Sequence, residues 1–534
     1  MTPLLEIRDL SVAFRTRRQD VTAVRNVSMR ILPGQTVAVV GESGSGKTTT
    51  AAAVNRLLPD NARITSGEIL FEGRDLVRAS RRELTAIRGA GIGLVPQDPM
   101  SNLNPLLKVG DQIAEALEVH GVATGRAARA RVLELLDLVG IPDPERRTGQ
   151  YPHEFSGGMR QRALIAMGLA CRPRLLIADE PTSALDVTVQ RRILDQLAAL
   201  TAEMGTAVFL ITHDLALAAE RADVVAVMYQ GEIVETGPAA EILAAPGHDY
   251  TRRLLGAVPS LSSVRVTELP GPPPADLLVV EGLRKVFPLR GTGEELTAVD
   301  EVSFRVPRGR TVAIVGESGS GKSTTANLVL GLEPPTAGSI RFDGTELAGL
   351  GRRELFAFRR RVQPVFQNPY ASLDPRYTVE KSITEPLRVH GVGSAAERRR
   401  AAAGLLEQVS LPASLGERLP HELSGGQRQR VAIARALALS PELVVLDEAV
   451  SALDVLVQAQ ILELLGELQR ELGLSYLFIS HDLAVVRMIS HEVHVMRRGR
   501  IVESGTTGEI FDRPADGYTR ELLAAIPGGT APPA

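Results

Sequence analysis

Short, fully apolar runs recur along the chain, and nearly the same series of runs appears in both halves. The runs of the first half are TVAVV (36–40), LLIAD (175–179), AVFLIT (207–212) and VVAVM (224–228). Each has the length of a strand and lacks the alternation of a half-exposed strand, which is typical of parallel strands covered on both faces. The pattern predicts an α/β fold in each half.

Between residues 97 and 156 the pattern changes to a helical period. The segments QIAEALEVHG and RARVLELLDLVG carry apolar residues three and four positions apart, as in amphipathic helices. The segment SITEPLRVHG stands at the matching place in the second half. We therefore expect a helical insert in each half of the chain.

The two halves are joined by VTELPGPPPADLL, a stretch in which four residues are proline. Proline at this density favours a stiff extended linker and excludes helix. With 534 residues, the chain is long enough for two domains that each have a core. We predict a first domain over 1–262, a Pro-rich linker over 263–276 and a second domain over 277–534, whose tail GGTAPPA is too polar to fold alone.

Composition narrows the function classes. The net charge is −3, aromatic residues make up 4% and Trp is absent, so neither a basic footprint nor base-stacking platforms for nucleic acid are expected. The apolar runs fall well short of the roughly 20 residues that cross a bilayer, and MTPLLEIRDL is not a secretory signal. We expect an intracellular protein.

The single cysteine, Cys171, limits the redox chemistry. One thiol cannot form an internal disulfide, and an iron–sulfur cluster normally takes four. We expect no iron–sulfur cluster, and we interpret Cys171 as a small buried residue at a helix end.

Two nearly identical glycine-rich segments carry the strongest chemical signal. GESGSGKT (41–48) and GESGSGKS (316–323) both fit G-x-x-x-x-G-K-[ST], whose backbone amides surround phosphate oxygens. The lysine neutralises the β- and γ-phosphates and the following hydroxyl suits Mg²⁺. The predicted phosphate-binding residues are Gly41, Ser43, Gly44, Gly46, Lys47, Thr48 and Thr49, with Gly316, Ser318, Gly319, Gly321, Lys322, Ser323 and Thr324 in the second half.

Adjacent carboxylates end one buried strand in each half, in LLIADE and LVVLDE. Asp179 and Asp447 are placed to hold magnesium. Glu180 and Glu448 are placed to orient or deprotonate the attacking water, a task that contributes ~10²–10⁴-fold to rate. The segments FSGGM and LSGGQ, which open a later helix, add another anion-binding helix terminus to each half.

Together these motifs resemble the ATP-binding cassette (ABC) ATPases, in which SGGQ is the signature sequence. The resemblance covers nearly the whole chain, twice. It implies two P-loop domains in tandem, each with a RecA-like core, an antiparallel β part and a helical insert. It also implies head-to-tail pairing, in which each ATP lies between the phosphate-binding loop of one copy and the signature of the other.

The resemblance also implies roles for further residues. Gln97 and Gln367 join the magnesium and catalytic groups, and His213 and His481, each after an apolar strand, reach the γ-phosphate. Phe14 and Phe287 end an early strand where the family stacks adenine. Site one joins Lys47, Thr48, Gln97, Asp179, Glu180 and His213 to Ser424, Gly425, Gly426 and Gln427; site two joins Lys322, Ser323, Gln367, Asp447, Glu448 and His481 to Ser156, Gly157 and Gly158. The SALD segments, 183–186 and 451–454, match the loop that links the two sites.

The two copies depart from each other in the signature. Met159 stands where the second copy has Gln427, and methionine cannot donate a hydrogen bond. We therefore predict that both sites hydrolyse ATP, at unequal rates. Ala449 and Val450 replace Pro181 and Thr182, a difference that we leave without interpretation.

Two functions remain open within the family. The chain is either the motor of an importer with separate membrane subunits, or a soluble tandem ATPase that acts on ribosomes or nucleic acid. The short linker and the absence of a basic arm favour the importer. The segments QDPMSNLNP and QNPYASLDP resemble those of the dipeptide, oligopeptide and nickel importers, and so do HDYTRRLLGAVPSL and GYTRELLAAIP near the ends of the copies.

The importer interpretation implies a set of partners. These are two integral membrane permeases and an extracytoplasmic substrate-binding protein, with no nucleic acid and no homodimer required. The chain would lie peripherally on the cytoplasmic face of the inner membrane and would use ATP and Mg²⁺. Peptides are the expected cargo, with nickel, glutathione-like compounds and opines left open.

Overall fold

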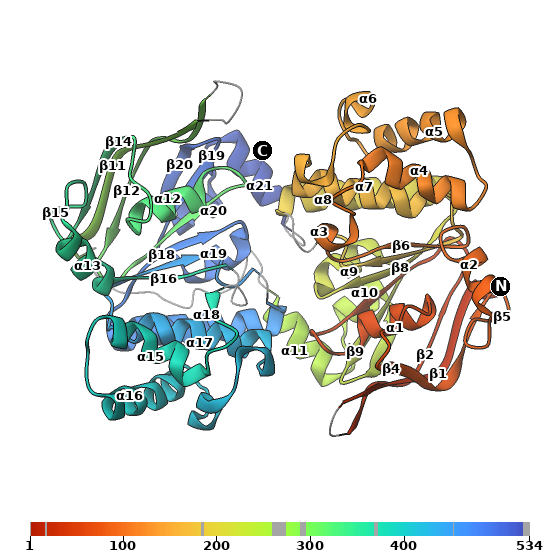
Figure 1. Ribbon diagram of the computed structural model, residues 1–534, viewed down its shortest axis with the longest axis horizontal. Helices are drawn as coiled ribbons and strands as arrows, with labels where there is room; N and C mark the ends of the chain where they lie inside the picture. Colours follow the sequence, from red (N-terminus) through yellow and green to blue (C-terminus); the bar gives the residue numbers. More distant parts are fainter. Residues whose placement is uncertain are drawn as a thin grey trace. The chain divides into compact units, whose positions relative to one another are not determined.

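The structure, a computed structural model, describes residues 2–16, 19–182, 186–258, 274–288, 295–367, 372–451 and 453–526. The chain divides into two compact units, the first comprising Met1–Leu185 and Val189–Val258, and the second Asp186–Thr188 and Pro259–Ala534 (Figure 1). Most of the predicted linker and the whole of the predicted tail lie outside the described residues, so the domain boundaries stay predictions.

The first unit is built on a six-stranded sheet in the order β10-β9-β3-β8-β7-β6. The four apolar runs of the first half form β3, β7, β8 and β9, which are parallel to their neighbours and almost wholly buried, as predicted. Only β10 is antiparallel, at one edge. The strands are β3 (Thr36–Val40), β6 (Ile92–Val95), β7 (Leu175–Asp179), β8 (Ala207–Thr212), β9 (Val224–Tyr229) and β10 (Glu232–Pro238).

A second, antiparallel sheet has the order β2-β1-β4-β5. Its apolar side chains, among them Ile7 and Leu10, share one core with Val37, Ile211 and helix α1 (Lys47–Val54). This shared core fixes α1, and with it the preceding loop, against both sheets. The strands are β1 (Leu5–Arg15), β2 (Asp20–Ile31), β4 (Ala62–Phe71) and β5 (Arg74–Asp75).

The predicted helical insert of the first unit is present. Helices α4 and α5 group with α7, apart from the antiparallel sheet (Figure 1). Cys171 follows α7 and is half-buried rather than buried, and its thiol contacts the carbonyl oxygen of Ala116 at 3.4 Å. The helices of this unit are α1 (Lys47–Val54), α2 (Arg81–Ile87), α3 (Pro99–Asn102), α4 (Val109–Val119), α5 (Gly125–Leu138), α6 (Pro144–Arg147), η1 (Pro152–Glu154), α7 (Gly157–Leu169), α8 (Val187–Met204), α9 (Leu215–Arg221), α10 (Ala239–Ala244) and α11 (Asp249–Ala257).

The second unit repeats both sheets, in the orders β12-β11-β14-β15 and β16-β17-β18-β13-β19-β20. Its strands are β11 (Asp276–Pro288), β12 (Glu295–Pro307), β13 (Thr311–Val315), β14 (Ala337–Phe342), β15 (Thr345–Glu346), β16 (Val362–Val365), β17 (Leu443–Asp447), β18 (Ser475–Ser480), β19 (Glu492–Arg497) and β20 (Arg500–Thr506). Its helices are α12 (Lys322–Val329), α13 (Arg352–Arg361), α15 (Val379–Val389), α16 (Ala395–Gln408), η2 (Ala413–Glu417), η3 (Pro420–Glu422), α17 (Gly425–Leu437), α18 (Val455–Leu472), α19 (Leu483–Ile489), α20 (Thr507–Asp512) and α21 (Gly517–Ala524).

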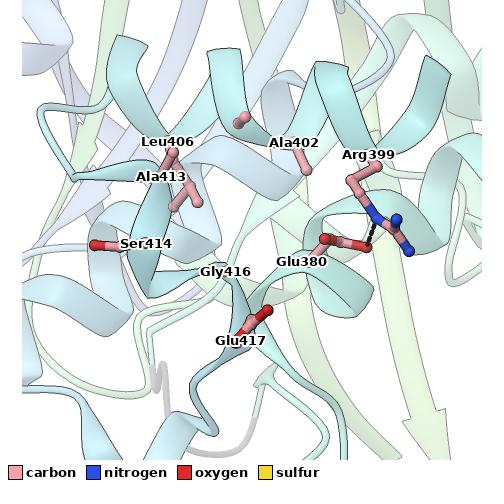
Figure 2. Close-up of a pocket in the computed structure, with 9 residues that line it drawn as sticks. Glu380, Arg399, Ala402, Leu406, Ala413, Ser414, Gly416 and Glu417 are labelled. Atoms are coloured by element: carbon pink, nitrogen blue, oxygen red, sulfur yellow. Dashed lines mark hydrogen bonds and ion pairs between the residues drawn. The ribbon is translucent and has the colours of Figure 1, made fainter. Parts of the chain in front are cut away.

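The helical insert of the second unit encloses a small pocket between α15, α16 and η2 (Figure 2). On one side of the pocket the Arg399 guanidinium contacts the Glu380 carboxylate at 3.3 Å, while Leu406 and Ala413 line the other side. The first unit has α6 in place of η2, so the two inserts differ most in this loop.

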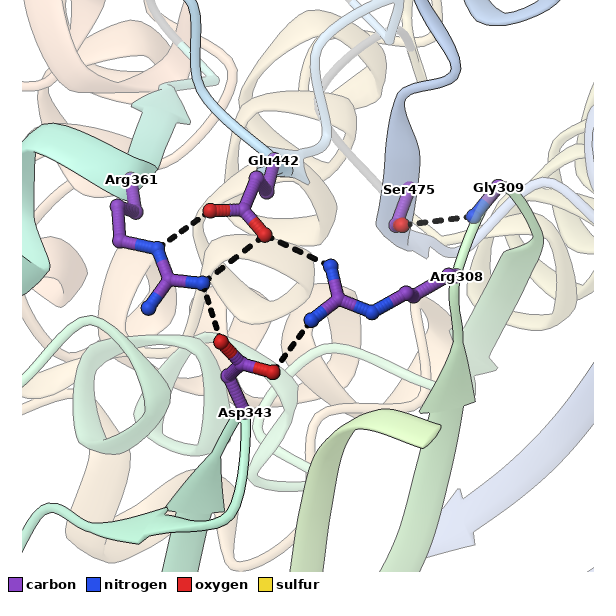
Figure 3. Close-up of polar contacts among 6 residues, drawn as sticks. All are labelled: Arg308, Gly309, Asp343, Arg361, Glu442 and Ser475. Carbon is purple, nitrogen blue, oxygen red and sulfur yellow. Dashed lines mark hydrogen bonds and ion pairs between the residues drawn. The ribbon is translucent and has the colours of Figure 1, made fainter. Parts of the chain in front are cut away.

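Four charged side chains of the second unit form a network at the end of the central sheet where the parallel strands begin (Figure 3). Arg308 donates to Glu442 at 2.7 Å, and Arg361 donates to Asp343 at 2.6 Å. Arg308 also contacts Asp343, and Arg361 also contacts Glu442, which closes the ring of ion pairs. These residues precede β13, β16 and β17 or lie in the β14–β15 turn, so the network links both sheets.

Among the described residues, no helix is both long and apolar enough to span a membrane.

Candidate functional site

The glycine-rich loop of the first unit joins β3 to α1. Gly46 stands directly before α1 with φ 106°, and a Cβ there would lie 2.6 Å from the carbonyl oxygen of Ala23, so only glycine fits. The buried Lys47 donates through Nζ to the carbonyl oxygens of Gly41 and Glu42, at 2.7 and 2.8 Å. Ser43, Gly44 and Thr48 are exposed, so the loop and the start of α1 are accessible from solvent.

The second unit reproduces this loop almost atom for atom. Lys322 donates to the carbonyl oxygens of Gly316 and Glu317, again at 2.7 and 2.8 Å. Gly321 precedes α12 with φ 108°. The remaining predicted loop residues, Ser318, Gly319, Ser323 and Thr324, are exposed or half-buried.

An oxygen pair lies beside each loop. The Thr48 hydroxyl donates to Oδ1 of Asp179 at 3.2 Å, and the Ser323 hydroxyl donates to Oδ1 of Asp447 at the same distance. Residues 131 and 124 positions apart in the sequence are thus brought together at the carboxyl ends of parallel strands. Hydroxyl and carboxylate oxygens form the donor set that Mg²⁺ prefers.

Two predicted residues, Gln97 and His213, converge on a third, Glu180, in the first unit. Gln97 donates through Nε2 to Oε2 of Glu180 at 2.9 Å, and Nδ1 of His213 lies 3.3 Å from the same oxygen. Glu180 has φ 44°, a left-handed conformation that non-glycine residues seldom adopt. This turn follows the end of β7, and the Glu180 N–H donates to the carbonyl oxygen of Ile211 at 2.9 Å.

The second unit has the same constellation. Gln367 and His481 contact Oε2 of Glu448 at 2.7 and 3.2 Å, and Glu448 has φ 48°. Strained backbone that recurs at one carboxylate in both copies is typical of a functional position. No local sequence pattern predicted this left-handed turn.

Burial and hydrogen bonding move the pKa values of the adjacent carboxylates in opposite directions. Burial raises the pKa of Asp179 to about 6 and raises that of Asp447. Burial also disfavours the charged form of Glu180 and Glu448, but hydrogen bonds with His213 and His481, together with the positive charges of these histidines and of Lys47 and Lys322, outweigh burial and lower both pKa values. The glutamates are therefore held ionised at neutral pH, as a general base requires.

The SGG segments open α7 and α17, as predicted. The Ser156 hydroxyl accepts from the backbone N–H of Met159 at 3.3 Å, and that of Ser424 accepts from Gln427 at 3.2 Å. Gly426 has no room for a side chain, because a Cβ would lie 2.5 Å from Val457. Gly157, Gly158 and Gly425 complete the two helix starts.

The two candidate adenine-stacking residues lie near the ends of β1 and β11 and are half-buried. Nζ of Lys285 lies 4.9 Å from the ring centroid of Phe287, in a cation–π contact that covers part of the ring. Adenine stacking on Phe14 and Phe287 stays a prediction.

Comparison with known proteins shows which family the chain belongs to. The family model described as ABC transporter matches residues 24–183 and 299–451. The chain belongs to the ABC transporter family. Its fold is two ABC ATPase cassettes in tandem, as predicted, and the chain binds and hydrolyses ATP. A second family model, the C-terminal region of oligopeptide/dipeptide transporters, matches residues 234–281 and 502–532, once after each ABC match.

Curated relatives align along nearly the full length of both cassettes. The glutathione import ATP-binding protein GsiA of Salmonella paratyphi A is 47% identical over 98% of this chain and 89% of that protein. The protein of the same name from Pectobacterium atrosepticum has the same identity and coverage. A solved dimeric structure of a bacterial ABC transporter cassette is 30% identical, covers 44% of this chain and 98% of that chain, and gives a TM-score of 0.41.

Part of the predicted chemistry lies outside the described residues. In the loops that match SALD, residues 183–185 and 452 are not described, and neither are residues 368–371 after Gln367. In the first cassette, the matching segment after Gln97 includes α3 and is described.

Proposed function

We propose that this protein is the motor subunit of an ABC importer for peptides, with glutathione as the first cargo to test. The observation that carries the proposal is the 47% identity to glutathione import ATP-binding proteins across both cassettes. The oligopeptide/dipeptide transporter region, present once after each ABC match, supports the same class of cargo. Glutathione is itself a tripeptide, so the two findings agree.

ATP is held in two composite sites under this proposal. In each, the lysine and the helix amides of one cassette bind the phosphates, and the signature serine and glycines of the other cassette complete the site. Because each nucleotide contacts both cassettes, ATP favours the closed arrangement. Closure then moves the helical inserts and, through them, the membrane subunits.

The hydrolytic step falls to the glutamates at the ends of β7 and β17. Glu180 and Glu448 accept the proton of the attacking water, while His213 and His481 hold the glutamate carboxylate in place and reach toward the γ-phosphate. Burial disfavours the charged form of His481, but its hydrogen bond with Glu448 and the negative charges of Glu448 and Asp482 together outweigh burial and raise its pKa, so this histidine favours its positive form more than a free imidazole does. That charge suits a group that faces a phosphate.

Magnesium is proposed as the accompanying cation. Thr48 with Asp179, and Ser323 with Asp447, would hold it, with Gln97 and Gln367 completing the two shells. The bound cation neutralises phosphate charge. It would also favour the ionised form of Asp179, whose pKa burial raises to about 6.

Two integral permeases and an extracytoplasmic binding protein are the proposed partners, with the motor lying peripherally on the cytoplasmic face of the inner membrane. No homodimer is required, since one chain carries both cassettes. The test is affinity purification of the tagged chain from gently solubilised cells, with mass spectrometry of its partners. Two multi-span permeases are expected; ribosomal proteins without any integral membrane partner would contradict the importer.

Cargo is tested by uptake of radiolabelled glutathione and of a dipeptide into cells that carry the wild-type chain or the Glu180→Gln, Glu448→Gln variant. We expect glutathione uptake with the wild-type chain alone. Dipeptide uptake without glutathione uptake would keep the importer and correct its cargo, and uptake that is equal in both strains would exclude this motor.

A further inference from the structure

The segment that ends each cassette places a tyrosine hydroxyl against the phosphate-binding loop. The backbone N–H of Glu42 donates to Oη of Tyr250, in α11, at 3.0 Å. The backbone N–H of Glu317 donates to Oη of Tyr518, in α21, also at 3.0 Å. Both tyrosines are buried, at 1% and 3% exposure. A contact repeated at the same length in both copies is part of how the cassette is built.

The hydrogen-bonded N–H belongs to the same peptide unit that holds the phosphate-binding lysine. The carbonyl group of Gly41 accepts from Nζ of Lys47 at 2.7 Å, and the N–H of that peptide, on Glu42, donates to Tyr250. One peptide plane is therefore fixed at both ends, by an ammonium and by a phenol. Hydrogen bonds in such a chain polarise and strengthen one another.

The end of strand β9 packs directly against the phosphate-binding loop. Gly41 has φ 153°, and a Cβ on it would lie 2.1 Å from the carbonyl oxygen of Met228, so the chain passes here without room for a side chain. The next residue, Tyr229, stacks on Tyr250 with ring centroids 4.2 Å apart. The strand end and the tyrosine thus form one wall.

In the second cassette the strand end packs against the loop in the same way, but a different side chain contacts the tyrosine. Gly316 approaches the carbonyl oxygen of Met496 equally closely, at 2.1 Å from its added Cβ. Arg497 stands in place of Tyr229, and its guanidinium lies 4.5 Å from the ring centroid of Tyr518. A stacked ring and a cation–π contact hold the tyrosine in the same position, which indicates that the hydroxyl is the feature both copies keep.

A clamp around the preceding turn fixes where each tyrosine helix starts. Glu235 accepts from the backbone N–H groups of Gly247 and His248, at 2.6 and 3.0 Å. Arg252 donates to the carbonyl oxygens of Pro246 and Gly247, at 2.8 and 2.9 Å. The second cassette repeats the clamp with Glu503, Ala515, Asp516, Pro514 and Arg520.

We propose that Tyr250 and Tyr518 are positioning residues of the two nucleotide sites, and that the C-terminal segment of each cassette is thereby a working part of its phosphate-binding loop. The hydroxyl orients the peptide that holds Lys47 or Lys322, and so sets the lysine for the phosphates. The inference rests on the nucleotide sites assigned under the proposed function, and it does not depend on the cargo.

The test measures ADP binding by calorimetry on the full chain with one loop disabled. In a Lys47→Ala background only the second loop binds, and Tyr518→Phe is compared with Tyr476→Phe. Tyr476 is a matched control, because its buried hydroxyl also makes a 3.0 Å hydrogen bond to backbone, to the carbonyl oxygen of Leu465, in the same cassette. We expect ADP affinity to fall about three- to tenfold for Tyr518→Phe, the range of one lost hydrogen bond, and less than twofold for Tyr476→Phe.

The mirror experiment compares Tyr250→Phe with its parent in a Lys322→Ala background, and the same three- to tenfold loss is expected. Thermal melting of all variants checks that each is folded. If Tyr518→Phe weakens ADP binding no more than Tyr476→Phe does, the positioning role is wrong while the site assignment stands. If the single-loop parents show no saturable ADP binding, the site assignment falls and this inference falls with it.

Discussion

Helices α7 and α17 begin with the same Ser-Gly-Gly sequence and the same backbone, yet their first turns are held differently. In α17 the Gln427 side chain accepts from the backbone N–H of Ser424 at 3.0 Å, while the Ser424 hydroxyl accepts from Gln427. This reciprocal pair is a capping box. In α7 only the half made by Ser156 is present, because Met159 has no carbonyl oxygen to return the bond.

This difference adds a consequence to the one predicted from sequence. Met159 was expected to remove a side-chain contact from a nucleotide site. The structure shows that the matching glutamine also caps the N-terminus of its own helix, the end that is predicted to bind an anion. The two signature helices therefore have the same backbone at their N-termini but differ in how many side-chain hydrogen bonds fix the first-turn amides.

The two cassettes also differ in their side-chain partners at the residue that precedes β7 or β17, where these parallel strands begin. Arg174 of the first cassette forms one ion pair, with Glu72 at 2.6 Å. The second cassette has Glu442 at the matching place, paired with two arginines that also pair with Asp343 in the network of Figure 3. One backbone position thus carries opposite charges in the two copies, and each copy surrounds it with its own partners.

The largest effect is expected where the two cassettes are alike. The double variant Glu180→Gln, Glu448→Gln should lose ATP turnover by at least about 10²-fold, because both general bases are removed while the phosphate-binding groups remain. Phosphate release measures the turnover, and retained ATP binding is checked with a fluorescent analogue. Glu134→Gln, on an exposed part of the first insert, serves as the control; turnover near the wild-type level in the double variant would refute the base assignment.

The single variants separate the two sites. Under the proposed composite sites, Glu448 serves the site that the Met159 signature completes, so Glu448→Gln should cost less turnover than Glu180→Gln, by about two- to fivefold, the range of one hydrogen bond. The measurement is steady-state ATP hydrolysis at saturating nucleotide. Equal losses from both single variants would contradict the inequality of the sites.

Exchange of the signature residues should shift this inequality. Met159→Gln completes the capping box of α7 and should stabilise the first cassette by about 0.5–1 kcal/mol. We expect the melting temperature to rise by about 1–4 °C and the gap between the single glutamate variants to narrow. Gln427→Met is the matched reverse change, and an unchanged melting temperature in both would show that the box contributes nothing.

The smallest effect is expected at the charge network. Glu442→Gln removes one of the two carboxylates that Arg308 and Arg361 share and leaves Asp343 to pair with both. It should destabilise the second cassette by about 0.5 kcal/mol, since these side chains are more than a third exposed and screened. The control Glu72→Gln breaks a single exposed pair in the first cassette and should change the unfolding free energy by less.

Acid should remove the difference in unfolding free energy between wild type and Glu442→Gln. Hydrogen bonds from Arg361 lower the pKa values of Glu442 and Asp343. A carboxylate with a lowered pKa stabilises the fold above its ordinary pKa of about 4, and the stabilisation is lost as the pH falls through the lowered value. Denaturant titrations of wild type and Glu442→Gln should therefore differ at pH 7 and converge as the pH falls from about 4 through the lowered pKa values. A difference in unfolding free energy that persists in stronger acid would point to packing in place of charge.

Sequence patterns predicted the organisation of the protein because they are local. Glycine loops, apolar strand runs and SGG segments each lie within a few consecutive residues, and their repetition predicted two similar α/β units. The resemblance to ABC ATPases placed Gln97 and His213 in the same site as Glu180. It gave no indication that both side chains meet on a single carboxylate oxygen.

What the sequence left open consists of contacts between distant segments. Tyr250 lies 208 positions from the loop residue that it contacts, and nothing in the residues around it signals that contact. The left-handed turn at Glu180 also has no local signature, since glutamate seldom adopts positive φ. Both depend on how the parallel strands and the C-terminal helix pack around the loop.

The sequence by itself determined that this chain is a tandem ATPase with two phosphate-binding loops, because short motifs encode the backbone shapes that hold phosphate. Only the tertiary structure decided which carboxylate stays ionised, which signature is fully capped and which tyrosine supports each loop. Those properties arise from burial and from hydrogen-bond partners that become neighbours when the chain folds, and no single stretch of sequence contains them.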